Sequence, residues 1–162
     1  MGRGSSKGSK PTHAKFGDRP ITIDKAKEVY GKLAEQGHLT SNDKMRQTRA
    51  QRLRDDLIKA GEGKFVDKVD YEAITPLFRK ASEANSQLSR AETQLKAFQA
   101  VEHMKSKKEM RDAKKLVEDR KREYEEANRA FEKARDAFGK EKYYKIRDAR
   151  IKAKLAELKK SK

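Results

Sequence analysis

Apolar residues recur in steps of three and four through the middle of the chain, and no Gly or Pro interrupts residues 77–138. A first run comprises Leu77, Ala81, Ala84, Leu88, Ala91, Leu95 and Phe98; a second comprises Val117, Tyr124, Ala127, Phe131, Ala134 and Phe138. This spacing places a narrow apolar stripe along one side of a helix, which needs a partner helix to cover it. The pattern predicts a coiled-coil type of packing.

The centre of this stretch favours a helix that turns back on itself. The segment Ser106-Lys107-Lys108-Glu109 matches the capping box that opens a new helix. The spacing from Phe98 through Val101 to Met104 also departs from the heptad. The arms on either side, residues 77–104 and 110–138, are nearly equal in length. We predict an antiparallel hairpin; the alternative is one unbroken helix of about 93 Å that pairs with another chain.

Two shorter helices are predicted ahead of this stretch. Thr22 or Asp24 is a suitable N-cap for a helix over residues 25–36, which Gly37 would end. A capping-box variant at residues 40–43 predicts a second helix over 41–60, ended by Gly61. In residues 64–71 apolar and polar residues alternate weakly, as they do in a strand. The segment is too short to build a sheet alone, and we expect a packed connector there.

The boundaries of the remaining elements follow from Pro, Gly and charge. Thr75 and Pro76 form a helix start, since Pro at the first helical position loses no hydrogen bond. Gly139 should end the hairpin, with a further helix after it. The sequence predicts an all-α protein: a disordered basic arm (1–19), a small helix-turn-helix-like module (20–71), a long helical hairpin or antiparallel coiled coil (72–139) and a basic helical tail (140–162).

Composition agrees with an elongated helical protein and excludes several classes of function. Hydrophobic residues make up 34% of the chain and charged residues 42%. This is little apolar material for a compact globule. No Cys is present, so disulfides and thiolate metal sites are excluded. The three His residues have no partners at metal-binding spacing. No run approaches the roughly 20 apolar residues that a membrane span needs. We expect no enzyme, cofactor or metal.

The net charge of +16 favours a polyanionic partner. Basic residues gather in the arm, in residues 44–64, in residues 105–123 and in the tail. In residues 105–123 acidic residues interleave with the lysines as helix ion pairs, which weakens that candidate. The pattern predicts separate basic patches.

Two of these patches contain the candidate nucleic-acid contacts. Arg and Gln can make bidentate contacts with base edges, and Lys can neutralise phosphates while a tyrosine such as Tyr143 or Tyr144 stacks on a base. The alternative interpretation is a solvated charged helix whose Arg stems cover apolar surface. The candidate residues are Arg46, Arg49, Arg52, Arg54, Lys142, Lys145, Arg147, Arg150, Lys152 and Lys154.

Two resemblances accompany these patterns. The order of Ile21-Thr22, Val29, Leu33-Ala34 and Gly37 resembles the N-terminal DNA-binding domain of plasmid proteins that place a helix-turn-helix ahead of a long coiled coil. It is confined to this short segment, and the Gly-Ser-rich turn of that domain is missing here. A Gly/Ser/His-bearing start before a charged helical hairpin also resembles the front of a colicin. The first resemblance implies DNA binding.

The leading hypothesis is a non-enzymatic cytoplasmic protein that binds DNA or RNA through basic patches on a coiled-coil frame. A nucleoid, ribosome or virion interior would also fit. The alternative is an interaction or assembly module, such as a ribosome-associated, virion or bacteriocin/secretion-type hairpin, whose apolar stripe contacts a protein partner or a second copy. We do not expect a membrane partner, although Gly2 lies in a sequence that matches the N-myristoylation pattern.

Overall fold

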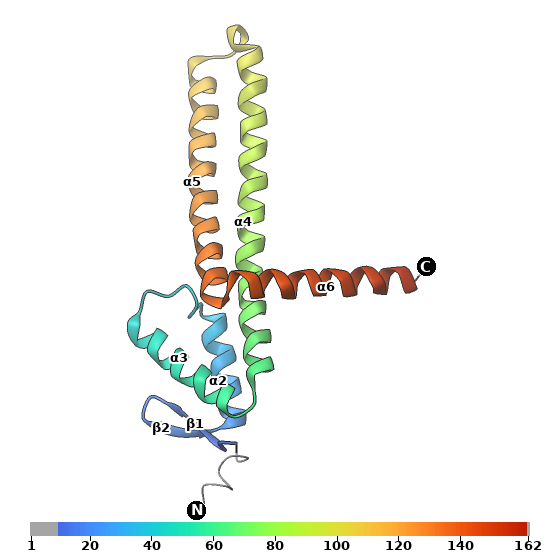
Figure 1. Cartoon of the computed structure of the whole chain (residues 1–162). Coiled ribbons are helices and arrows are strands. Elements are labelled where there is room, and N and C mark those ends of the chain that lie inside the picture. Colours follow the sequence, from blue (N-terminus) through green and yellow to red (C-terminus); the bar gives the residue numbers. More distant parts are fainter. Residues whose placement is uncertain (1–9, 162) are drawn as a thin grey trace, which may run out of the picture. The chain divides into compact units, whose positions relative to one another are not determined.

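The computed structural model describes residues 10–161 and is almost entirely helical, which confirms the predicted all-α class. The chain divides into two compact units, residues 1–73 with 136–162 (unit 1) and residues 74–135 (unit 2). The elements labelled in Figure 1 are β1 (His13–Phe16), β2 (Arg19–Thr22), α2 (Ile23–Glu35), α3 (Lys44–Lys59), α4 (Gly63–Ala100), α5 (Lys107–Phe138) and α6 (Lys140–Lys160). A 3₁₀ turn, η1 (Glu102–Met104), separates α4 from α5.

Part of the predicted disordered arm is a β-hairpin. Strands β1 and β2 pair antiparallel with Ala14 opposite Ile21. Between the strands lie Gly17 and Asp18, and Gly17 has a φ of 64°. Tight hairpin turns require such positive φ angles. Ala14 is buried in the core of unit 1, so tertiary packing orders a segment whose composition alone suggests disorder. Residues 1–9, which contain Gly2 and the match to the N-myristoylation pattern, lie outside the described residues.

The core of unit 1 lies where the β-hairpin, α2, α3 and the first turns of α4 meet. Its buried side chains include Tyr30, Leu53, Leu57 and Val66, all with 0% exposure. Residues 64–71, expected to be a connector, are therefore helical and belong to α4. In so short a segment the apolar spacing does not separate helix from strand.

The long helix begins earlier than predicted. Helix α4 starts at Gly63 and passes through Pro76, the expected start. Proline inside a helix removes one backbone hydrogen bond and crowds the preceding turn. The burial of Val66, Tyr71 and Ile74 holds the helix together ahead of it. The boundary between the two units falls at residues 73 and 74, close to this proline.

The predicted helix ends are confirmed at three glycines and one threonine. The Thr22 hydroxyl accepts a hydrogen bond from the backbone N–H of Lys25 at 3.2 Å. Gly37, Gly61 and Gly139 have φ angles of 80°, 84° and 116°. Glycine adopts these angles without steric cost. Helix α3 starts at Lys44, not at residue 41, because Asp43 is the residue whose side chain accepts the first backbone N–H groups.

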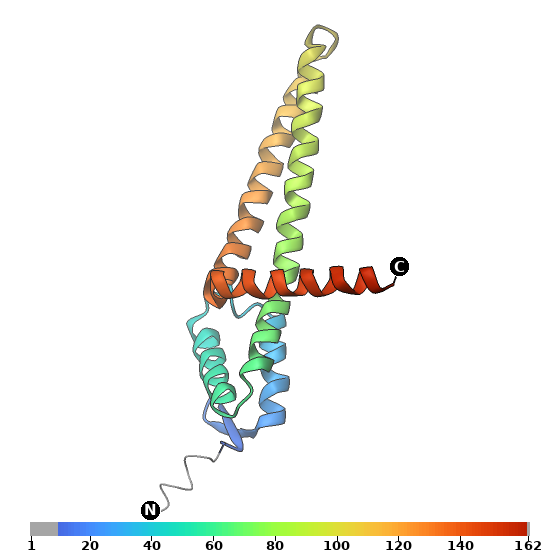
Figure 2. The same ribbon diagram turned by 45° about the vertical axis from the view of Figure 1, so that its right-hand side comes forward.

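Unit 2 is the predicted helical hairpin. Helices α4 and α5 run antiparallel side by side (Figures 1 and 2). Residues from both predicted stripes are buried, among them Ala81, Ala91, Ala127 and Ala134. The Phe78 and Phe131 rings pack edge-on, with their centroids 5.5 Å apart. The alternative of one unbroken helix is wrong.

The capping box at the start of α5 forms as predicted. The Glu109 backbone N–H donates to the Ser106 hydroxyl at 3.0 Å, and the Ser106 N–H donates to the Glu109 carboxylate at 3.2 Å. This hydrogen bond from Ser106 is the main reason that the pKa of Glu109 is lowered from its ordinary value of 4.5.

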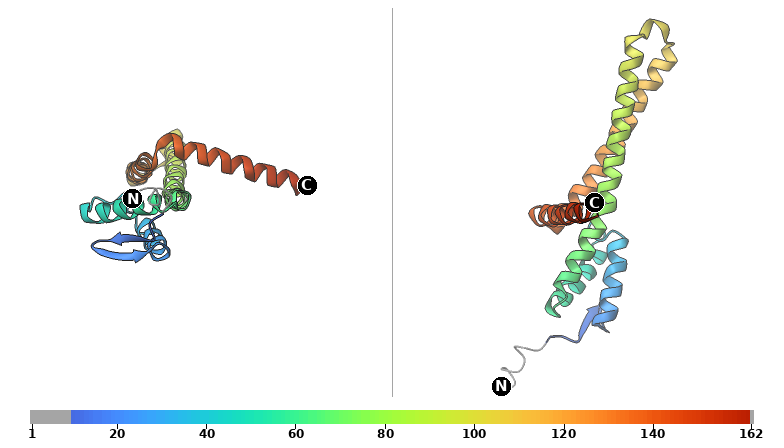
Figure 3. Two further views of the ribbon diagram at one scale, coloured as in Figure 1. Left: turned by 60° about the horizontal axis from the view of Figure 1, so that its bottom comes forward. Right: turned by 90° about the vertical axis from the view of Figure 1, so that its right-hand side faces the viewer.

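Helix α6 is buried only near its start. Tyr143 is 3% exposed and stacks on Tyr71, with ring centroids 5.2 Å apart. Residues 148–161 are all exposed, and the left view in Figure 3 shows α6 as one continuous helix. Among residues 10–161, no helix combines the length and the apolar character that crossing a bilayer requires.

The capping box gives a first prediction. Ser106→Ala should destabilise unit 2 by about 1 kcal/mol, because the first turn of α5 loses its side-chain acceptor. The same capping box should make stability depend on pH. Because folding lowers the pKa of Glu109, the ionised carboxylate stabilises unit 2 above pH 4.5, and this stabilisation is lost as the pH falls through the lowered pKa. Urea unfolding measures the change, with Ser89→Ala on the exposed face of α4 as control. Equal effects of the two substitutions would contradict the assignment.

Candidate nucleic-acid interface

A shallow basic groove lies on unit 1 between α3 and the turn of the β-hairpin. It has a volume of about 340 Å³ and is lined by Gly17, Asp18, Lys44, Met45, Thr48, Arg49 and Arg52. Three of these residues are cationic and one is acidic. We call this surface the α3 groove.

Two predicted arginines line the α3 groove. The Arg49 guanidinium lies 5.7 Å from the centroid of the Phe16 ring, and Arg52 donates a hydrogen bond to the Gly17 carbonyl at 3.4 Å. Both contacts anchor the side chains on the β-hairpin and leave the charges exposed. Arg46 is exposed at the start of α3, next to the groove. Within residues 10–161, none of these three guanidiniums forms an ion pair with a carboxylate.

Arg54 differs from the other three arginines because its side chain contacts a buried carboxylate. Its guanidinium lies 3.6 Å from the carboxylate of Asp70, which is 1% exposed. The Tyr30 hydroxyl donates to the same carboxylate at 2.7 Å, and the His38 imidazole lies 3.6 Å from it. Residues from α2, α3 and α4 thus converge on one buried charge. A buried carboxylate needs such partners, so Arg54 is held in place here.

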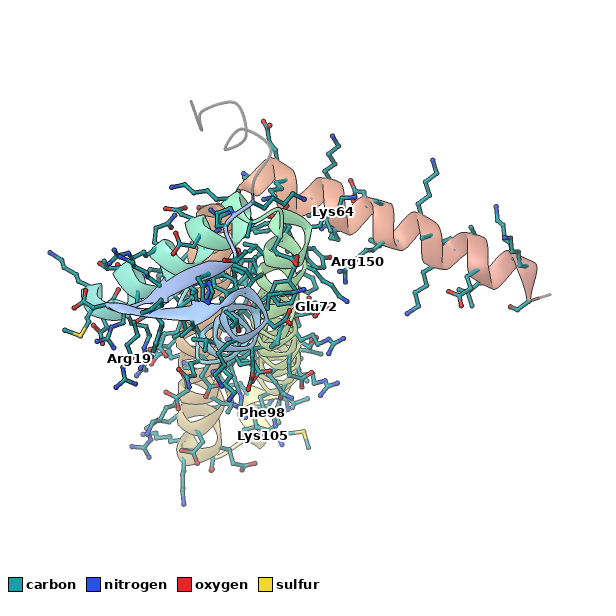
Figure 4. The ribbon with its side chains drawn as sticks, turned by 90° about the horizontal axis from the view of Figure 1, so that it is seen from below. Arg19, Lys64, Glu72, Phe98, Lys105 and Arg150 are labelled. Atoms are coloured by element: carbon teal, nitrogen blue, oxygen red, sulfur yellow. The ribbon has the colours of Figure 1, made fainter. Side chains whose placement is uncertain are left out.

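The predicted tail residues fall into two groups. Lys142, Arg147 and Arg150 contact carboxylates of their own unit: Lys142 binds Asp67, Arg147 lies 3.3 Å from Asp148, and Arg150 lies 3.9 Å from Glu72. Figure 4 labels the Arg150 and Glu72 pair. Each of the three cations also lies over an aromatic ring: Lys142 over Phe138, Arg147 over Tyr144 and Arg150 over Tyr71.

The other tail residues point into solvent. Lys145, Lys152 and Lys154 are exposed and form no ion pair within the described chain. Tyr143, a predicted stacking residue, is buried against Tyr71 and cannot stack on a base, because it fastens α6 to its own unit. Tyr144 is half-buried, with the Arg147 guanidinium 4.6 Å from its ring centroid.

A second basic groove lies at the tip of the hairpin in unit 2. It measures about 560 Å³ and is lined by Glu102, Lys105, Ser106, Lys107, Met110, Arg111, Lys114, Lys115 and Glu118. Lys105 lies 4.2 Å from the Phe98 ring centroid, a pair labelled in Figure 4, and pairs with Glu109. Basic and acidic residues interleave in the sequence here, so their order along the chain does not reveal that five cations gather at this groove.

The pattern of Arg and Lys alone does not locate the α3 groove. Lys44, Met45 and Thr48 belong to it only because the β-hairpin lies beside α3. The signal that could have found this hairpin is Gly17-Asp18 between two four-residue segments, each of which mixes apolar and polar residues. Among residues 10–161, no group of three or more potential ligands is arranged to hold a metal ion.

Comparisons of the chain with protein families, with characterised proteins and with solved structures found no match. The resemblances noted in the sequence therefore receive no support from them, and the candidate interface is defined by the geometry above.

The buried cluster around Asp70 gives a second prediction. Tyr30→Phe should lower the free energy of unfolding by about 1–3 kcal/mol, because the carboxylate loses its shortest hydrogen bond. Tyr124→Phe is the matched control, because its hydroxyl has no hydrogen-bond partner in the described chain. Urea unfolding measures both, and an equal small effect would contradict the role of Tyr30.

Alkaline pH tests the same cluster. Burial, followed by the nearby Asp70 charge, raises the pKa of the Tyr30 phenol above its ordinary value of 10.0. The protonated Tyr30 phenol therefore contributes its full stabilisation below pH 10.0, and this stabilisation is lost as the pH rises from there towards the raised pKa. We expect stability to fall above pH 10.0 and the fall to be smaller in Tyr30→Phe.

Proposed function

We propose that the protein is a non-enzymatic nucleic-acid-binding protein that contacts phosphates through the α3 groove and the exposed lysines of α6. The observation that carries the proposal is the set of exposed arginines at the α3 groove, which have no carboxylate partner in the described chain. Arg46, Arg49 and Arg52 keep their full charge towards solvent, and two of them are positioned by contacts with the β-hairpin.

Phosphate binding suits this arrangement better than base reading does. Phosphate contacts need cations at a suitable spacing and release counterions on binding, whatever the sequence. The groove is shallow, and its cations, Lys44, Arg49 and Arg52, all come from α3. We expect binding to DNA and RNA with little sequence preference. The hairpin-tip groove would add a second contact in the same chain.

The proposal implies a location where nucleic acid is present. A cytoplasmic protein associated with the nucleoid or with ribosomes would meet this condition, as would a virion-internal one. The coiled-coil hairpin of unit 2 would then present the hairpin-tip groove as a further basic surface.

An assembly module without nucleic-acid binding is the second candidate. The observation that favours it is an exposed apolar stripe on α6, since Ile151, Leu155 and Leu158 are 50%, 56% and 55% exposed. Phosphate contact gives no reason for three large aliphatic side chains in solvent. The two functions are compatible at the α3 groove, because the stripe and the α3 groove involve different residues.

Salt dependence tests nucleic-acid binding. Arg46→Ala/Arg49→Ala should reduce the slope of log K against log [salt] by about two, because each phosphate that a cation neutralises adds roughly 0.9 to the slope. The matched control is Arg90→Ala/Lys96→Ala, which removes the same charge from exposed positions on α4. Electrophoretic shifts with random duplex DNA and random single-stranded RNA at several salt concentrations provide the measurement. Absence of binding by the wild type, or equal slopes for both variants, would overturn the proposal.

The two groups of tail cations should separate by their effects. Lys152→Ala/Lys154→Ala should weaken nucleic-acid binding and leave stability unchanged. Lys142→Ala/Arg150→Ala should leave the salt slope nearly unchanged and lower the free energy of unfolding by up to about 1 kcal/mol, because both side chains form partly exposed ion pairs. Thermal unfolding measures stability, and the same electrophoretic shift assay measures nucleic-acid binding. Weaker binding by Lys142→Ala/Arg150→Ala with no change for Lys152→Ala/Lys154→Ala would contradict this grouping and show that the ion pairs open on binding.

A further inference from the structure

Helix α6 has three exposed apolar residues at heptad spacing that no described element of its own unit covers. Ile151 and Leu158 are seven residues apart, and Leu155 lies between them at a spacing of four and three. All three are at least half exposed. We call these three residues the α6 stripe. Its width is that of a two-helix seam, with Ile151 and Leu158 at d positions and Leu155 at an a position.

The residues beside the α6 stripe are all of one charge. In this heptad register Lys145, Lys152 and Lys159 occupy e positions, and Arg147 and Lys154 occupy g positions. These are the five e and g positions from residue 145 to residue 159, and none is acidic or neutral. The acidic residues of this segment lie elsewhere: Asp148 at an a position and Glu157 at a c position.

Charges at e and g decide which helix pairs with a coiled-coil face. A second copy of α6 would bring Lys and Arg against Lys and Arg, in either the parallel or the antiparallel arrangement. The resulting repulsion opposes self-association. A narrow stripe also offers little to a membrane surface, where an in-plane helix needs a broad apolar face. Ala149, Ala153 and Ala156 lie on the other side of α6 and add no bulk to the stripe.

We propose that α6 forms a heterotypic coiled coil with an amphipathic helix of another protein, one that carries Asp or Glu at its e and g positions. Such a helix would cover Ile151, Leu155 and Leu158 and place carboxylates opposite the lysines beside them. Asp148, the polar residue at an a position, would favour one register. When the partner is bound, its carboxylates occupy the α6 lysines, and nucleic-acid contact is left to the α3 groove and the hairpin-tip groove. This inference goes beyond the proposed function and does not rest on it.

The test uses the full chain and two synthetic peptides. Both peptides have Ile and Leu at a and d over roughly three heptads; one has Glu at every e and g position and the other has Lys. We expect the Glu peptide to bind at least about tenfold more tightly in fluorescence anisotropy. Lys152→Glu/Lys154→Glu/Lys159→Glu should reverse the preference. Equal binding of the two peptides, or no binding, would overturn the proposal.

A matched pair of substitutions separates the seam from general charge attraction. Leu155→Asp places a carboxylate in the α6 stripe, and Ala153→Asp makes the same change in charge at a nearby f position. We expect loss of Glu-peptide binding in the first and near wild-type binding in the second, with unchanged helicity by circular dichroism in both. Equal losses would show that the peptide responds to net charge alone and would overturn the proposal.

One further measurement separates this inference from the proposed function, and two separate other occupants of the stripe from the proposed one. Arg46→Ala/Arg49→Ala changes the α3 groove and should bind the Glu peptide as the wild type does. Peptide binding would therefore remain even if the protein did not bind nucleic acid. Sedimentation with vesicles of phosphatidylglycerol and phosphatidylcholine, if abolished by Leu155→Asp, would assign the stripe to a membrane and overturn the proposal. A concentration-dependent dimer of the wild type that Leu155→Asp dissociates would assign it to a second copy and overturn it likewise.

Discussion

Both units are built under a shortage of apolar side chains. Hydrophobic residues make up 34% of the chain against 42% charged ones, so neither unit can rely on a thick core. Many of the buried positions are occupied by alanines, which allow helices to approach closely but contribute little area each. Aromatic rings provide much of the rest, and several of them are covered by the stems and heads of cations. Lys27 lies over Phe65, Lys105 over Phe98 and Arg150 over Tyr71.

This use of cations changes how the net charge should be interpreted. A count of Lys and Arg treats every one as free to meet a polyanion. Arg54 is instead committed to the buried Asp70, and Lys142 and Arg150 combine a carboxylate with a ring. Such positions stabilise the fold and have little charge to offer. On α3 and on the outer part of α6, the cations that are exposed and have no carboxylate partner in residues 10–161 form a smaller and more definite surface than the total of +16 indicates.

The sequence predicted what depends on local chemistry and failed where long-range packing decides. The helical hairpin, the Ser106–Glu109 capping box and the glycine helix ends follow from spacing and backbone geometry within a few residues, and all are present. The β-hairpin is ordered because Ala14 packs into a core formed by α2 and α3, which lie further along the chain. The continuation of α4 through Pro76 likewise depends on the burial of Val66, Tyr71 and Ile74. The α3 groove was missed in part for the same reason, since it exists only where the β-hairpin meets α3.

The outer part of α6 is subject to the same shortage of apolar residues. An isolated helix of this length is marginal in water, and helices in proteins owe most of their stability to a covered apolar face. The start of α6 has such cover through Tyr143, whereas the α6 stripe has none within the described part of its unit. A chain short of apolar residues nevertheless places three large aliphatic ones there, in heptad register and between two rows of Lys and Arg. Solubility alone would be served by polar residues, and phosphate binding by the lysines alone. A second helix with the opposite charge pattern accounts for both features at once.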